Sequence, residues 1–169
     1  MILLVSGSLR SGSTNTALLR TAHELEPDSV LFDGLDRLPH FNPDDDYDPL
    51  PPAVVELRAL IAQADAILFC TPEYAGALPG SFKNLLEWTV GGGEIYRKPV
   101  AWINVAAPGR GENAHESLRK VLGYVGGEIV EDACLRIPVA HQDVGEDGLL
   151  ADPGVRAAIG RSLAALANS

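Results

Sequence analysis

The sequence has few of the residues that would build a disulfide framework, a zinc centre or a nucleic-acid surface. Only two cysteines occur among the 169 residues. That is too few for a disulfide framework or for a structural zinc site with four protein ligands. Lysine and arginine total 13 against 23 aspartates and glutamates, which gives a formal net charge of −10. Because phosphates and anionic lipids are bound by Lys and Arg clusters, this balance argues against a nucleic-acid or membrane partner.

Long apolar runs are also missing. Runs such as residues 64–70 (ADAILFC) are much shorter than the roughly 20 apolar residues that cross a bilayer. The first residues, MILLVSGS, show neither the basic leader nor the small-residue cleavage site of a secretory signal. These features predict a cytoplasmic protein. Hydrophobic residues still make up 46% of the chain, so a core can form, and the length predicts one domain over residues 1–169.

The cysteines and histidines show no spacing typical of a metal site. Cys70 and Cys134 each end an apolar, strand-like run, which favours a buried hydrophobic role for both thiols. No H-x-x-x-H or similar pair occurs among the histidines. We therefore expect surface or structural roles for His23, His40, His115 and His141.

Short apolar runs alternate with helical patterns along the chain. Strands are predicted at residues 1–6, 29–34, 65–71 and 99–107, and a fifth within 127–137. Helices are predicted at residues 15–25, 53–62, 80–88, 114–125 and 153–167, the last capped by Asp152. Residues 35–52 contain five prolines and are expected to be irregular.

Five strands that alternate with helices predict an α/β fold, a parallel sheet covered by helices on both faces. At this length the flavodoxin-like three-layer sandwich with strand order 2-1-3-4-5 is favoured. In that order the fourth strand lies between the third and the fifth, so Cys70 and Cys134 are too far apart for a disulfide. Such sheets bind ligands beyond the carboxyl ends of their strands, which directs attention to the loops after strands 1, 3 and 4.

The loop after the first strand, residues 6–16 (SGSLRSGSTNT), opens a helix. The free N–H groups and positive dipole end of that helix attract an anion. Several hydroxyls, the Asn15 amide and the Arg10 guanidinium add donors suited to a phosphate monoester. The alternative is a Ser-rich helix cap with a surface arginine. Ser13 stands where a P-loop requires lysine, which argues against a nucleoside triphosphatase.

The loops after the third and fourth strands suit a planar ligand. Residues 72–80 (PEYAGALPG) hold two prolines and two glycines, which predicts a stiff loop with Tyr74 at its tip for stacking. An ordinary strand-to-helix turn is the alternative. Residues 106–114 (AAPGRGENA) show a G-x-G-x-x-A pattern after the fourth strand instead of the first. We interpret this segment as a second backbone loop near the same ligand.

On this alternating pattern, residues 7–15 and 72–88 resemble the NADPH-dependent FMN reductase family, as does the segment 38–44 (LPHFNPD). The resemblance implies a flavodoxin-like fold, bound FMN, and NADPH or NADH as hydride donor. It also implies electron transfer to a small acceptor such as free flavin, a quinone, an azo dye or a metal oxyanion. Members of the family are commonly homodimers or homotetramers with the flavin near a subunit interface.

The resemblance also implies a set of cofactor-binding residues. Those at the FMN phosphate would be Ser8, Arg10, Ser13 and Asn15, with Thr14 beside them. Those edging the isoalloxazine ring, largely through backbone groups, would be Pro72, Glu73, Tyr74, Ala75 and Gly76. The loop at Ala107 and Gly109 would approach the pyrimidine side of the ring. No acid, base or nucleophile is assigned, because the cofactor carries the chemistry.

The chain departs from the family pattern at two places. Position 75 is often Asn in the family and is Ala here. The loop after strand 4 often has Ser and paired glycines in the family, and here it reads Ala106-Ala107 and then Gly-Arg-Gly at residues 109–111. Arg110 could meet the extra phosphate of NADPH or be a solvated surface arginine. Two other functions stay open: a flavodoxin-type electron carrier that does not oxidise NADPH, and a ligand- or partner-binding protein that has lost flavin.

Overall fold

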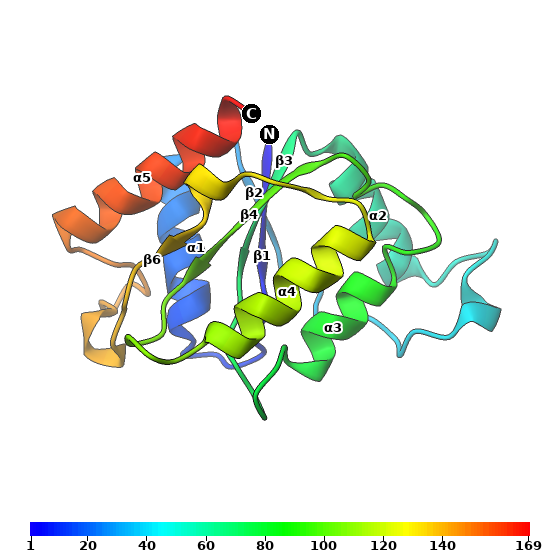
Figure 1. The fold of residues 1–169 in the computed structure, drawn as a ribbon, viewed down its shortest axis with the longest axis horizontal. Helices are drawn as coiled ribbons and strands as arrows, with labels where there is room; N and C mark the ends of the chain where they lie inside the picture. Colours follow the sequence, from blue (N-terminus) through cyan, green and yellow to red (C-terminus); the bar gives the residue numbers. More distant parts are fainter.

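The computed structural model describes residues 1–169 and contains a parallel sheet at its centre (Figure 1). The strand order is β2-β1-β3-β4-β5, with a further strand, β6, also paired with β4. The strands are β1 (Ile2–Ser6), β2 (Val30–Phe32), β3 (Ala66–Cys70), β4 (Pro99–Asn104), β5 (Glu128–Ile129) and β6 (Leu135–Arg136). The predicted α/β flavodoxin-like order 2-1-3-4-5 is confirmed.

Helices cover both faces of this sheet. On one side lie α1 and α5, and on the other lie α2, α3 and α4 (Figure 1). The helices are α1 (Thr14–Leu25), α2 (Pro52–Gln63), α3 (Gly80–Glu87), α4 (Glu112–Tyr124) and α5 (Pro153–Ala167). Asp152 caps α5 as predicted, since its Oδ1 accepts a 2.8 Å bond from the Val155 N–H. None of the helices combines the length and the apolar content that crossing a membrane requires.

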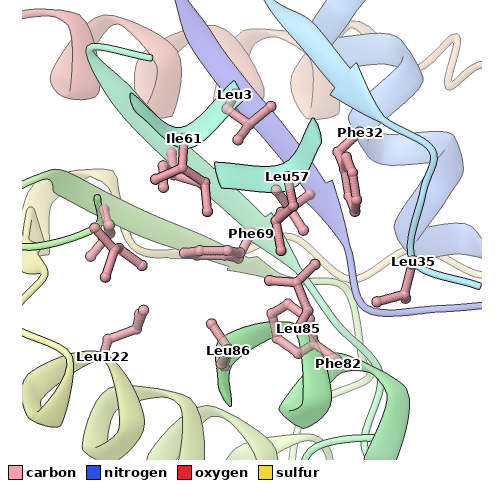
Figure 2. Close-up of a cluster of buried hydrophobic side chains, with 14 of the residues drawn as sticks. Leu3, Phe32, Leu35, Leu57, Ile61, Phe69, Phe82, Leu85, Leu86 and Leu122 are labelled. Carbon is pink, nitrogen blue, oxygen red and sulfur yellow. The ribbon is translucent and has the colours of Figure 1, made fainter. Parts of the chain in front are cut away.

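The core consists of two hydrophobic clusters, one on each face of the sheet. Successive residues of a strand point to opposite faces, so Leu3 joins the cluster under α2, α3 and α4, while Leu4 joins the one under α1 and α5. Figure 2 shows the first cluster, in which Phe69 of β3 faces Leu122 and the leucines of α3. Burial on both faces explains why the strands appear as continuous apolar runs in the sequence.

The prediction of a single fifth strand within residues 127–137 is wrong, because this segment forms two short strands, β5 and β6. Val100 of β4 pairs with Ile129 of β5, and Ile103 of β4 pairs with Leu135 of β6. The chain from Ile129 to Leu135 is longer than the stretch of β4 it accompanies, and a 3-10 turn at Glu131–Ala133 holds the excess. This turn interrupts the ladder, and β6 then resumes beside the carboxyl end of β4.

The two cysteines are free thiols, as expected, but only one is fully buried. Cys70 is 0% exposed at the end of β3, and this burial raises the pKa of its thiol far above the ordinary value. Cys134 is only partly buried, so the predicted full burial is wrong, but its side chain packs against both hydrophobic clusters as a hydrophobic residue would. It follows directly after the 3-10 turn and precedes β6.

Candidate functional site

A cleft of about 660 Å³ opens at the carboxyl ends of β1, β3 and β4. Three loops and the segment around residues 139–141 line it, as the fold predicts. Ten of the twelve predicted cofactor residues belong to this lining: Ser8, Arg10, Ser13, Thr14, Asn15, Pro72, Glu73, Tyr74, Ala107 and Gly109. The volume falls in the range of roughly 300–1,000 Å³ that small-molecule ligands occupy.

Gly7 allows the loop after β1 to cross over the end of β3. Its N–H donates a 2.9 Å hydrogen bond to the Cys70 carbonyl oxygen. A Cβ atom built at this position would lie 2.1 Å from Thr71 Oγ1 and 3.0 Å from the ring of Phe82. Only glycine fits this close approach, so the position of the loop depends on it.

The start of α1 offers several unused donors to the cleft. Ser13 precedes the helix, is 6% exposed, and makes no side-chain capping bond. The first N–H groups of a helix have no intrahelical partners and favour an anion. Arg10 is exposed on the same loop and forms no ion pair within the chain. This loop therefore presents hydroxyls, amide groups and one guanidinium to the cleft.

Asn15 also helps to hold the loop in place. Its Oδ1 accepts a hydrogen bond from the Cys70 thiol at 3.3 Å, and its Nδ2 lies 3.5 Å from Ser13 Oγ. The side chain is 5% exposed. Asn15 thus ties the first turn of α1 to the end of β3 while it borders the cleft.

The loop after β3 forms a tight hairpin. Tyr74 and Ala77 exchange two backbone hydrogen bonds of 3.1 Å, and the residues between them, Ala75 and Gly76, have φ values of 53° and 72°. Two positive φ angles at these positions are typical of a type I′ turn. Tyr74 is 48% exposed and lines the cleft. Ala75 and Gly76 lie at the exposed tip, outside the lining, so the structure does not bring them together with the other ten residues.

Glu73 connects this hairpin to α4. Its Oε2 accepts a 3.1 Å bond from the Ala114 N–H, and its Oε1 accepts a 3.4 Å bond from Asn113 Nδ2. The residue before α4 is Gly111, which has no side chain for capping, so the carboxylate of Glu73 supplies the cap instead. The sequence pattern did not predict this role, because the two residues are far apart along the chain.

The loop after β4 contains a tight turn at Ala107–Arg110. The Arg110 N–H donates a 3.0 Å bond to the Ala107 carbonyl, and Gly109 has a φ of 77°. Proline in the second position and glycine in the third are typical of a type II turn. Asn104, at the end of β4, accepts a 2.9 Å bond from the Ala106 N–H. The loop is therefore an ordered wall of the cleft.

Two histidines lie near the cleft, in different roles. His115 is 8% exposed on α4, and its Nδ1 lies 2.5 Å from the Gly111 carbonyl oxygen, which fits the expected structural role. Burial lowers the pKa of His115 below its ordinary value, so the ring is neutral and Nδ1–H is the donor. His141 instead lines the cleft, with its Cε1 3.8 Å from the position of a Cβ on Gly12. No sequence motif indicated this placement, since His141 belongs to a segment beyond β6.

The parallel sheet, the anion-attracting loop after β1 and the cleft at the carboxyl ends define a flavodoxin-like nucleotide-binding α/β protein. The family model described as NADPH-dependent FMN reductase matches residues 1–142. The chain belongs to this family, and the predicted resemblance is confirmed.

Individual relatives agree with the family assignment. An NAD(P)H-dependent FMN reductase of Pseudomonas aeruginosa is 34% identical over 170 residues, which cover 98% of this chain and 92% of that protein. A probable NADPH:quinone oxidoreductase of rice is 40% identical over 109 residues, but the match spans only 51% of the rice protein and 61% of this chain. The solved flavoenzyme NAD(P)H:(acceptor) oxidoreductase of Paracoccus denitrificans superimposes with a TM-score of 0.78 at 26% identity, over 99% of this chain and 97% of that one.

Proposed function

We propose that this protein is an NAD(P)H-dependent flavin reductase that binds FMN in the cleft and passes electrons to a small acceptor. The observation that carries the proposal is the convergence of three loops on one cleft in a member of this family. The loop after β1 suits the phosphate, and the hairpin and the turn after β4 suit a planar ring. Residues 1–169 would act together as one FMN-binding domain.

The phosphate end of the cleft has a donor set that matches a phosphate monoester. Arg10 has no carboxylate partner, so its guanidinium is free to make charge-assisted hydrogen bonds with a dianion. The hydroxyls of Ser8, Ser13 and Thr14 border the same space. The positive end of α1 adds to the attraction.

Bound FMN would supply the hydride-accepting centre and the two-electron chemistry. The chain's own residues would bind FMN, orient its ring and shield it from water. Tyr74 would cover part of the ring, and the turn at Ala107–Arg110 would present backbone groups to its polar edge. Arg110 is available for the extra phosphate of NADPH, because it lines the cleft and makes no ion pair. No side chain is required as a general acid or base.

A quinone or a similar small molecule is the proposed electron acceptor, which the name of the rice relative supports. We also propose a cytoplasmic homodimer or homotetramer. Large exposed side chains support self-association, since Tyr124 is 84% exposed, Tyr96 67% and Val90 63%. Light scattering coupled to gel filtration tests the oligomer, and a monomer at all concentrations would contradict it.

FMN binding is tested by titrating the apoprotein with FMN and with riboflavin, which lacks the phosphate, while flavin fluorescence is recorded. Arg10→Gln is expected to weaken FMN binding by about tenfold, the scale of one charge-assisted hydrogen bond, and to leave riboflavin binding unchanged. Arg161→Gln is the matched control, because Arg161 is exposed on α5, away from the cleft. A wild-type protein that binds no FMN would overturn the proposal.

Anaerobic addition of NADPH to the FMN complex separates reductase from carrier. A reductase loses the visible flavin absorption band rapidly and regains it when a quinone is added. A flavodoxin-type carrier retains the band in the presence of NADPH. Persistence of the band with both NADPH and NADH would refute the reductase activity but leave FMN binding intact.

A further inference from the structure

Arg136 joins the split fifth strand to the cleft wall. It lies on β6, paired with Asn104 at the carboxyl end of β4. Its Nη1 donates to three carbonyl oxygens of the neighbouring loop, those of Ala106 at 3.1 Å, Ala107 at 3.2 Å and Arg110 at 3.0 Å. Its Nη2 donates to Glu112 Oε1 at 2.7 Å. One guanidinium thus holds both ends of the turn after β4.

This arrangement decides which way the peptide groups of the loop face. In a trans peptide the C=O of one residue and the N–H of the next point in opposite directions. Arg136 draws the carbonyls of Ala106 and Arg110 toward itself, on β6. The N–H groups of Ala107 and Gly111 must then point away from Arg136. Both of these residues line the cleft.

Neither of these two N–H groups donates a hydrogen bond within the chain. They are therefore free to donate to a ligand. Three further contacts hold the loop in the same state: Asn104 Oδ1 accepts from the Ala106 N–H, Asn104 Nδ2 lies 3.5 Å from the Arg110 carbonyl, and His115 Nδ1 binds the Gly111 carbonyl. Gly111 itself has a φ of 81°, and a Cβ there would lie 2.9 Å from Asn104 Oδ1, so the backbone is closely packed at this point.

We infer that Arg136 is a positioning residue of the flavin site, which holds the loop 106–111 so that the Ala107 and Gly111 N–H groups donate to acceptor atoms of the bound ring. The inference rests on the proposed function and deepens it. Glu112 neutralises the guanidinium charge, so the two peptide dipoles, and not the charge itself, act on the ring. Donors aimed at a ring that gains negative charge on reduction favour its reduced form.

Arginine is suited to this role and lysine is not. The rigid fork of the guanidinium reaches several carbonyls and a carboxylate at once, whereas an ammonium group cannot span them from one position. Arg136→Lys therefore removes the geometry and keeps the charge. The Arg136 side chain is 32% exposed, so the replacement is expected to leave the fold intact. Arg119→Gln is the control, because this nearby arginine pairs with Glu131 on the same face and does not contact the loop.

The test measures binding of FMN and of riboflavin, together with the midpoint potential of bound FMN, in the wild type, Arg136→Lys, Arg136→Gln and Arg119→Gln. Both Arg136 variants are expected to bind FMN and riboflavin about tenfold more weakly, because the ring is common to both ligands. The affinity for reduced FMN is expected to fall by a further factor of about ten, which lowers the two-electron midpoint potential of the bound FMN by about 30 mV. Arg119→Gln is expected to match the wild type.

Other outcomes overturn the inference in recognisable ways. If the wild type binds flavin and both Arg136 variants have the same affinity and the same midpoint potential as the wild type, Arg136 has no part in the site. Full function in Arg136→Lys but not in Arg136→Gln would mean that charge, not geometry, matters, and would also refute the inference. If the wild type itself binds no flavin, the proposed function has failed instead. Hydrogen exchange of the Ala106 and Arg110 amides in the apoprotein tests the loop without any flavin. These two amides donate to Asn104 Oδ1 and to the Ala107 carbonyl, so their exchange should accelerate in the Arg136 variants if the loop loses its position.

Discussion

Replacing Gly7 by alanine tests the packing that places the phosphate loop. The added Cβ would lie 2.1 Å from Thr71 Oγ1, 2.6 Å from Thr71 Cβ and 3.0 Å from Phe82 Cγ. Thr71 is 2% exposed and Phe82 0%, so neither neighbour has free space to move into. The backbone of Gly7 needs no positive φ, and steric overlap is therefore the only cause of the expected effect.

Overpacking of a buried site typically costs about 1–3 kcal/mol, and overlap with a branched, buried neighbour places Gly7→Ala near the upper end, about 3 kcal/mol. For a chain of this length, that corresponds to a fall in Tm of about 6–12 °C. Urea unfolding followed by circular dichroism measures the loss. Because the displaced loop carries Ser8 and Arg10, FMN affinity is expected to fall as well.

Two further variants make the test specific. Gly160→Ala, in α5, meets no atom within 4 Å and is expected to stabilise the protein by up to about 1 kcal/mol. Gly7→Ala combined with Thr71→Gly removes the worst overlap, so its loss of stability should be smaller than the sum of the two single losses. A Gly7→Ala variant within about 0.5 kcal/mol of the wild type would refute the packing argument.

Three other predictions follow from single features of the structure. Ala75 occupies a left-handed conformation that costs a non-glycine residue about 1–2 kcal/mol. Ala75→Gly is therefore expected to raise the free energy of unfolding by a net of about 0.5–1 kcal/mol, after the entropy of glycine is subtracted, and so to raise the urea midpoint. A lower midpoint would contradict this. The Arg58 Nη2 lies 2.6 Å from Asp46 Oδ1, and both side chains are at most 10% exposed, so Arg58→Met should cost about 3–5 kcal/mol in urea unfolding by leaving a buried carboxylate unpaired. A smaller loss than in Asp46→Asn would count against that reasoning. The pKa of His115 is lowered in the folded state by burial, so its contribution to stability is complete above the ordinary value of 6.5 and is lost as the pH falls below it. The free energy of unfolding, measured at a series of pH values, should therefore fall as the pH is lowered from 6.5 toward the range where carboxylates titrate. His115→Gln should remove this part of the pH dependence. If the pH dependence is unchanged in the variant, His115 is not its source.

Much of the fold was predictable because its signals are local. Strands buried on both faces appear as apolar runs, and helices between them show one apolar stripe, so the sheet order followed from alternation and length. The three loops of the cleft were predictable for the same reason, since parallel strands place their carboxyl ends at one edge. The split between β5 and β6 was not predictable, because it depends on register against β4.

The position of the site was predictable, but the long-range hydrogen bonds that hold its loops were not. Arg10, Ser13 and Tyr74 lie on loops whose place in the fold follows from the strand order. No local sequence pattern indicated that Glu73 caps α4 or that Arg136 positions the loop after β4. Each contacts residues more than twenty positions away in the chain.

The sequence by itself thus determined the layers, the order of the sheet, the family and the loops that border the cleft, because periodicity and turn residues act over a few positions. Only the tertiary structure decided which side chains hold those loops still. The hydrogen bonds that Glu73 accepts and Arg136 donates, the close packing of Gly7 and the burial of His115 all depend on distances between elements that are remote in sequence. Those distances are set by packing of the whole core, which no local pattern encodes.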